Sequence, residues 1–279
     1  MTDAHLHLWD LAASPYAWLD SAPAGLRRTL AWEDARPLVA SLGATRVILV
    51  QADDTRADTE HLQRTAGRIE RGDDAVDRAD VVAWMPLEDP GQVERLLDDR
   101  AAMAHVVGVR HLVHGEPDPG FLERDAVAAS LARIAAAGLA LDVPDAHPRH
   151  MAQVARLAES HPDLTIVMDH VGKPPLGDAS AMSDWSRELS RIAAAPTTVA
   201  KISGLSTSGD GRYTDAVALA VDLFGPERCL FGSDWPIAPH PMDAGPARGL
   251  CEHIQQRYPD DAVQILSRTA ERVYRRLGE

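Results

Sequence analysis

The sequence predicts one α/β domain, a (β/α)8 barrel of the TIM type that spans residues 1–279. Short apolar runs rich in β-branched residues alternate along the whole chain with stretches of helical periodicity. Runs such as Val47-Ile48-Leu49-Val50 are apolar on both faces, as the buried strands of a parallel sheet are. The length of 279 residues is also ordinary for such a barrel.

Eight strands and eight helices are expected in strict alternation. The strands are recognised by short apolar runs, and the helices by apolar positions three and four residues apart. Val127, Leu131 and Ile134 show the helical spacing, and Gly138 ends their helix. The expected strands cover residues 2–8, 45–51, 80–86, 105–113, 139–143, 164–170, 197–203 and 228–234. The expected helices cover residues 32–42, 56–71, 90–103, 122–137, 148–160, 181–195, 213–224 and 261–277.

An open, doubly wound sheet is the structural alternative to the barrel. Such a sheet normally carries a glycine-rich turn directly after its first strand. Here that position holds His-Leu-Trp-Asp, and the first glycine of the chain is Gly25. The barrel is therefore the preferred interpretation.

The chain is acidic, with a formal net charge of −14 at pH 7. This charge argues against nucleic acid or an anionic membrane as a partner, while a small acidic substrate held by local cations stays possible. With a strand expected from residue 2 and no apolar run of about 20 residues, neither a signal peptide nor a membrane helix is expected. Cys229 and Cys251 form no C-x-x-C pair, so reduced thiols and a cytoplasmic location are expected. The sequence leaves open whether the chain forms a homo-oligomer.

The first expected strand contains two histidines two positions apart. Side chains in a strand repeat every second residue on one face, so Asp3, His5 and His7 are expected to point the same way. Leu6 and Leu8 are expected on the opposite face. Two imidazoles on one face of a strand suit a divalent metal or a polarised carbonyl oxygen.

The ends of the other expected strands are also rich in polar residues. In a (β/α)8 barrel the carboxyl ends of the strands form the active site. Asp234 ends the last strand, beside the first, where its carboxylate can accept a proton from water or bind a metal. We therefore predict Asp234 and His170 as catalytic residues, and one divalent metal, zinc before others, on His5, His7, His170 and Asp234. Catalysis without a metal is the alternative.

Substrate contacts are predicted from the same strand ends. Arg110 can orient a carboxylate or hydroxyl with its planar guanidinium, and only one of Arg110 and His111 faces inward because they alternate. Asp169 likewise alternates with His170 and is expected to play a structural part. The predicted substrate-binding residues are Arg110, Gln51, His147, Lys173, Lys201 and Trp235.

Seven segments of the chain carry a family resemblance. In order they are DAHLHLWD, VILVQA, VVAWMPLEDP, GVRHLV, DHVGKP, KISGL and FGSDWP, and they extend over almost the whole chain. Together they resemble the amidohydrolase superfamily, in particular amidohydrolase-related family 2. The branch that they resemble includes L-fuconolactonase, L-rhamnonolactonase and 2-pyrone-4,6-dicarboxylate lactonase.

The resemblance implies hydrolysis of a small lactone derived from a sugar acid, as in carbohydrate catabolism. Asp234 would activate water, and the histidines or their metal would polarise the lactone carbonyl. Arg110-His111 stands at the end of the fourth strand, where a modified lysine bridges two metals in other members of the superfamily. A site with one metal or none is therefore expected.

Three other functions stay open at this point. A metal-dependent decarboxylase or an amide hydrolase of the same superfamily would use the same His-x-His and terminal aspartate. A phosphate-binding barrel would use the Gly/Ser-rich residues 203–211 after the seventh strand, although no matching glycine loop follows the eighth. A non-catalytic ligand-binding barrel is the alternative of another class.

Overall fold

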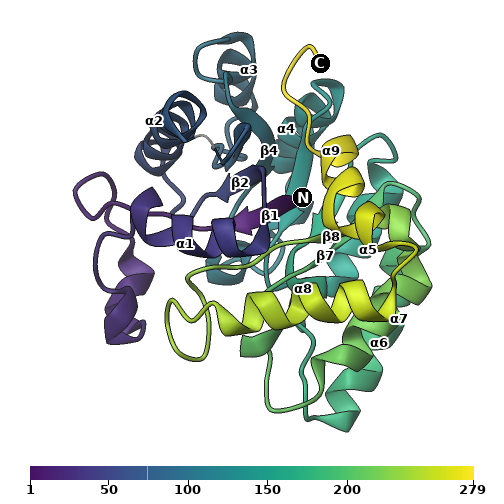
Figure 1. Ribbon diagram of the computed structural model, residues 1–279. Coiled ribbons are helices and arrows are strands. Elements are labelled where there is room, and N and C mark those ends of the chain that lie inside the picture. Colours follow the sequence, from purple (N-terminus) through teal and green to yellow (C-terminus); the bar gives the residue numbers. More distant parts are fainter. Residues whose placement is uncertain (74) are drawn as a thin grey trace.

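The computed structural model describes residues 1–73 and 75–279. Its eight parallel strands form one sheet in the order β1 to β8, which confirms the predicted (β/α)8 barrel (Figure 1). The strands are β1 (Thr2–Leu6), β2 (Arg46–Val50), β3 (Arg78–Ala83), β4 (Val106–Arg110), β5 (Ala140–Val143), β6 (Ile166–Met168), β7 (Thr198–Ile202) and β8 (Cys229–Phe231).

Helices surround the strands on the outside of the barrel (Figure 1). Among the described residues, no helix is both long enough and apolar enough to cross a membrane. The α-helices are α1 (Trp32–Leu42), α2 (Arg56–Gly72), α3 (Pro90–Asp98), α4 (Asp125–Ala136), α5 (Met151–Ser160), α6 (Ala179–Ala193), α7 (Tyr213–Phe224), α8 (Gly245–Arg257) and α9 (Thr269–Val273).

The last part of the chain differs from the single helix predicted over residues 261–277. Helix α8 already occupies Gly245–Arg257 and ends just before Pro259, because the residue before a proline disfavours the helical conformation. A π-helical turn, Gln264–Arg268, then leads directly into α9. Tyr274, directly after α9, is fully buried and packs with the residues inside the barrel, so the chain end covers one end of it.

The barrel closes between the segment after β8 and the segment that contains β1. The amide of Asp234 donates to the carbonyl of His5 (2.8 Å), and the amide of His7 donates to the carbonyl of Trp235 (2.8 Å). Closure therefore depends on the same backbone that carries the predicted catalytic residues. It brings the first and the last of the seven sequence motifs into direct contact.

Strands β6 and β8 are shorter than predicted because tight turns replace their last residues. The backbone turns into the left-handed region at His170 (φ 56°), Val171 (φ 53°) and Asp234 (φ 59°). A β-branched residue such as valine rarely adopts this conformation, which costs free energy and tends to occur at functional sites. As a result both Asp169 and His170 face inward, although strand alternation predicted opposite faces.

The prediction that Asp3 points the same way as His5 is wrong, because β1 contains a β-bulge. Asp3 pairs with Val47 and Leu6 pairs with Leu49, so two residues of β1 lie opposite one residue of β2. The extra residue reverses the alternation between Asp3 and His5. Asp3 instead accepts hydrogen bonds from the amides of His5 (3.3 Å) and Ser233 (2.8 Å) and holds the two strand ends together.

Candidate active site

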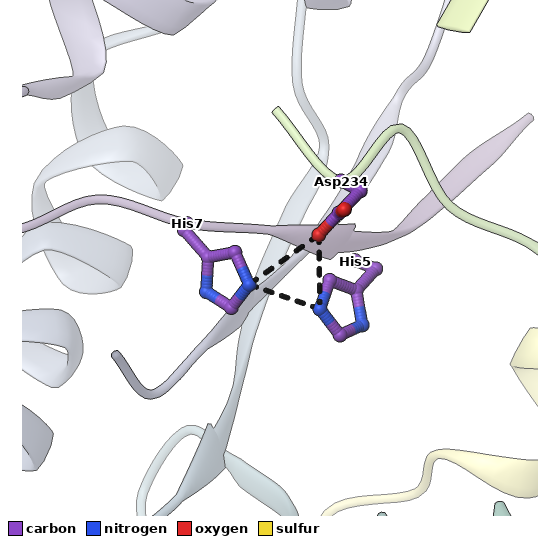
Figure 2. Close-up of side chains that lie close together, drawn as sticks. All are labelled: His5, His7 and Asp234. Carbon is purple, nitrogen blue, oxygen red and sulfur yellow. Dashed lines mark hydrogen bonds and ion pairs between the residues drawn. The ribbon is translucent and has the colours of Figure 1, made fainter. Parts of the chain in front are cut away.

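His5, His7 and Asp234 converge at the carboxyl ends of β1 and β8 (Figure 2). The Nε2 atoms of the two histidines lie 3.0 Å apart, and each lies 3.6 Å from Oδ1 of Asp234. All three residues are buried. The structure therefore brings together three of the four predicted metal ligands as one compact group.

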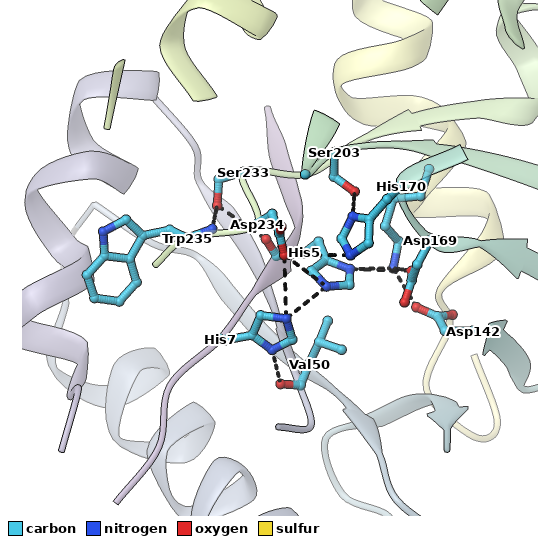
Figure 3. Close-up of polar contacts among 12 residues, drawn as sticks. His5, His7, Val50, Asp142, Asp169, His170, Ser203, Ser233, Asp234 and Trp235 are labelled. Atoms are coloured by element: carbon cyan, nitrogen blue, oxygen red, sulfur yellow. Dashed lines mark hydrogen bonds and ion pairs between the residues drawn. The ribbon is translucent and has the colours of Figure 1, made fainter. Parts of the chain in front are cut away.

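His170, the fourth predicted ligand, lies at the edge of this group. Its Nε2 is 3.7 Å from Oδ1 of Asp234. Its ring packs edge-to-face against the His5 ring, with the ring centroids 4.8 Å apart. Its Nδ1 is 2.9 Å from the hydroxyl oxygen of Ser203 (Figure 3). Ser203 thus fixes the orientation of the His170 ring.

The protonation of His7 follows from its partner. Nδ1 of His7 lies 2.9 Å from the carbonyl oxygen of Val50, which can only accept a hydrogen bond. Nδ1 therefore carries the proton, and the lone pair of Nε2 faces His5 and Asp234. This is the tautomer that a metal ligand or a hydrogen-bond acceptor requires.

Burial and neighbouring side chains together shift the pKa values of His5, His170 and Asp234. Burial lowers the pKa of His5 well below its ordinary value and also lowers the pKa of His170. Burial opposes the ionisation of Asp234, but His170, His7 and His5 outweigh it and lower the pKa of this carboxyl. The neutral imidazole of His5 and the ionised carboxylate of Asp234 are the forms in which these side chains coordinate a divalent cation.

The donor set fits a single zinc ion. Tetrahedral zinc with bonds of about 2.0–2.1 Å places neighbouring ligand atoms about 3.3 Å apart. The 3.0 and 3.6 Å separations of the His5, His7 and Asp234 atoms lie on either side of that value. Nitrogen and carboxylate oxygen are also ligands that zinc commonly takes in proteins.

A network of buried charges lies on the other side of His5. Nζ of Lys201 is 2.8 Å from Oδ1 of Asp169 and 2.5 Å from Oδ2 of Asp142. Nε of Arg110 is 2.9 Å from Oδ2 of Asp169. Burial alone would raise the pKa of Asp169, but Lys201, His5 and Arg110 hold it well below its ordinary value.

A cavity of about 180 Å³ opens next to the converging residues. Arg110 and Lys173 line it, together with His7, His170 and Asp234. The other residues that line it are Trp18, Ala52, Leu112, His114, Asp145 and Ile237.

Four predicted substrate contacts are absent from the described lining of this cavity. Gln51 is buried and donates to Asp54 Oδ1 (2.8 Å). Lys201 is buried within the charge network, and Trp235 is buried beside the barrel closure. His147 lies in the loop after β5, outside the lining residues.

Two glycines pack against the site, and neither was expected to have a role there. A Cβ on Gly204 would lie 2.5 Å from both Asp234 Oδ2 and His170 Nδ1. A Cβ on Gly232 would collide with the Cβ of His5. Both glycines stand inside the motifs KISGL and FGSDWP, which is the signal that could have marked them.

The loop after β1 supplies one wall of the cavity through Trp18. The Trp18 indole donates to the carbonyl of Ala52 (2.7 Å), and the Tyr16 hydroxyl donates to Asp58 Oδ1 (2.6 Å). The amide of Tyr16 donates to Asp53 Oδ2 (3.1 Å). Two carboxylates near the start of α2 therefore hold this wall in place.

The Asp58 carboxyl predicts a pH dependence of stability. Burial raises its pKa to about 6, against about 3.9 in an unfolded chain. Between these values the folded protein keeps a proton that the unfolded chain releases, so this group lowers stability as pH rises towards neutral. The shift corresponds to about 3 kcal/mol.

We therefore expect Asp58→Asn, which cannot ionise, to gain stability relative to the wild type as the pH rises from about 4 to 7. Urea unfolding of both proteins across this range measures the effect. A difference in unfolding free energy that stays constant with pH would contradict the expectation.

Comparison with known proteins identifies relatives along almost the whole chain. The family model described as amidohydrolase matches residues 2–276. An L-fucono-1,5-lactonase of Burkholderia ambifaria is 30% identical over 98% of this chain and 94% of its own length. An L-fucono-1,5-lactonase of Burkholderia multivorans is 31% identical over 84% of this chain and 81% of its own length.

A solved structure agrees with these relatives. An amidohydrolase from Burkholderia multivorans with bound zinc is 28% identical, with a TM-score of 0.84 over 98% of each chain. Both the sequence and the fold are therefore shared over nearly the full length. The chain belongs to the amidohydrolase family.

Proposed function

We propose that this protein hydrolyses a small sugar-acid lactone, and that it is a carboxylic ester hydrolase. The observation that carries the proposal is the similarity to two L-fucono-1,5-lactonases, which covers 98% and 84% of this chain. The convergence of His5, His7, His170 and Asp234 beside a cavity supports it. We also propose a cytoplasmic location, since Cys229 and Cys251 are both unpaired thiols.

In the proposed mechanism Asp234 is the general base. Its ionised carboxylate takes a proton from a water molecule, which attacks the lactone carbonyl carbon. The C–O bond of the ring then breaks, and the leaving alkoxide takes the proton back from Asp234. Atoms and protons are thereby balanced with no reactant other than water.

The histidines stabilise the negative charge that develops on the carbonyl oxygen. His5, His7 and Asp234 would hold a divalent metal, zinc in our proposal, which when bound supplies Lewis-acid polarisation of the carbonyl. His170, fixed by Ser203, lies close enough to Asp234 to orient its carboxylate. Each group acts within a buried site, where electrostatic interactions are strong.

The cavity walls would position the substrate. Arg110 and Lys173 supply hydrogen-bond donors for ring hydroxyls, and the Trp18 ring supplies an apolar face. Lys173 already donates to Thr207 Oγ1 (2.8 Å), which fixes its ammonium group at the cavity edge. A small polyhydroxylated ring matches this mixture of donors and one aromatic wall.

A lactone panel tests the proposed function. Proton release is measured for five- and six-membered aldonolactones, for a dicarboxylate lactone and for amides, with carbon dioxide release from aromatic acids measured in parallel. We expect hydrolysis of the aldonolactones. Carbon dioxide release without lactone hydrolysis would instead support the decarboxylase alternative.

Metal removal tests the proposed cofactor. We expect dialysis against a chelator to abolish lactone hydrolysis and added zinc to restore it, because the ion that His5, His7 and Asp234 would hold would supply Lewis-acid polarisation of the carbonyl. Circular dichroism checks that the protein stays folded. Full activity in metal-free protein would contradict the proposed role and favour direct hydrogen bonding by the histidines.

A further inference from the structure

A second group of possible cation ligands lies next to the first. His5, Asp142 and Asp169 offer ligand atoms that all lie within 4.8 Å of one another (Figure 3). Nζ of Lys201 is 2.5 Å from Asp142 Oδ2, 2.8 Å from Asp169 Oδ1 and 3.1 Å from His5 Nδ1. One ammonium group therefore contacts a ligand atom of every member.

We propose that Lys201 is a built-in cation that occupies this second group and limits the protein to one divalent metal. In this assignment Lys201 is a positioning residue, because it acts on the site through Asp169, which contacts His5. This inference depends on the proposed function in one respect, the identity of the first ion, which His5, His7 and Asp234 would hold. The second group is defined by its own contacts.

Charge balance supports the assignment. Asp142 and Asp169 are matched by two cations, Lys201 and Arg110, and all four side chains are buried. The Tyr274 hydroxyl also contacts both oxygens of Asp142 (2.9 and 2.8 Å) and donates to this carboxylate. A divalent ion added to this balanced group would bring uncompensated charge into the interior, which is costly.

His5 links the two groups. Its Nε2 faces His7 and Asp234, while its Nδ1 faces Lys201 and Asp169. A histidine that binds a metal through one nitrogen is normally fixed by a partner on the other. Oδ1 of Asp169, 3.4 Å from Nδ1 of His5, is placed to accept the hydrogen of that nitrogen, and Nζ of Lys201 in turn holds Asp169 Oδ1 at 2.8 Å.

Metal counting tests the proposal. Zinc per chain is measured by elemental analysis after equilibrium dialysis for the wild type, Lys201→Ala and Lys201→Met. Alanine removes the cation and opens space, whereas methionine removes the cation and keeps most of the volume. We expect Lys201→Ala to bind one more zinc ion than the wild type, and Lys201→Met to bind no more than the wild type.

A thermal shift provides a second readout. Added zinc should raise the melting temperature of Lys201→Ala more than that of the wild type or Lys201→Met, because an ion that binds only the folded state stabilises it. Two zinc ions in the wild type, or a folded Lys201→Ala protein that binds no additional ion, would overturn the proposal. If Lys201→Ala does not fold, Lys201→Ser, which places a neutral hydroxyl beside the two carboxylates and keeps all three members of the second group, is tested with the same two outcomes.

The experiment separates this inference from the proposed function. His7→Asn should remove the first ion and leave the additional ion of Lys201→Ala in place. A wild type without bound zinc would therefore contradict the proposed cofactor, while an additional ion in Lys201→Ala would still support the role of Lys201.

Discussion

Replacing Asp234 with asparagine is expected to reduce lactone hydrolysis by at least about 10²–10⁴-fold, the usual contribution of one general acid or base. Asparagine keeps the shape of the side chain but cannot accept the proton from water. It also removes the negative charge that faces His5, His7 and His170. The measurement is kcat/KM on the best aldonolactone of the panel.

Asp222→Asn is the matched control for this prediction. Asp222 is exposed on α7, outside the residues that line the cavity, and its replacement makes the same chemical change. We expect the control to retain wild-type activity and both variants to unfold at similar urea concentrations. Near-wild-type turnover by Asp234→Asn would rule out this residue as the base.

Replacing Gly204 with alanine is expected to lower kcat/KM by about 100-fold, the cost of a displacement of about 1 Å in a catalytic group. The added Cβ would lie 2.5 Å from both Asp234 Oδ2 and His170 Nδ1, closer than real carbon atoms approach. At least one of these side chains must therefore move. Gly204 also has a left-handed backbone (φ 59°), which alanine adopts at a cost.

Gly43→Ala separates the two effects. Gly43 has almost the same backbone conformation (φ 65°), but a Cβ there would meet no atom within 4 Å. We expect the left-handed backbone to cost each alanine variant about 1 kcal/mol of stability, and the displaced side chains to add to this loss in Gly204→Ala. Only Gly204→Ala should lose activity; an equal loss in both variants would show that backbone strain, not displacement of Asp234 and His170, is responsible.

The alternation of strands and helices was predictable because it depends on local patterns. A buried parallel strand needs apolar residues on both faces, and a helix needs them at its own spacing, so each element can be recognised in its own segment. Because the strand ends converge at one face of such a barrel, His5, His7, His170 and Asp234 could be grouped without coordinates.

The orientation of individual side chains was harder to predict. Alternation assumes a regular strand, and the bulge in β1 turned Asp3 away from His5. The left-handed turn after β6 likewise brought both Asp169 and His170 inward. One residue of irregular backbone is enough to change which of the following side chains face inward. No local sequence pattern indicated the bulge in β1 or the turn after β6.

Local patterns in the chain were thus sufficient to predict the barrel and to group His5, His7, His170 and Asp234 at its strand ends. Three-dimensional packing was needed to show that Lys201 lies beside His5 instead of in the cavity, that Trp18 forms a wall, and that Gly204 leaves room for Asp234. These features are contacts between segments far apart in the chain. Their geometry depends on how the whole barrel closes, which local periodicity does not specify.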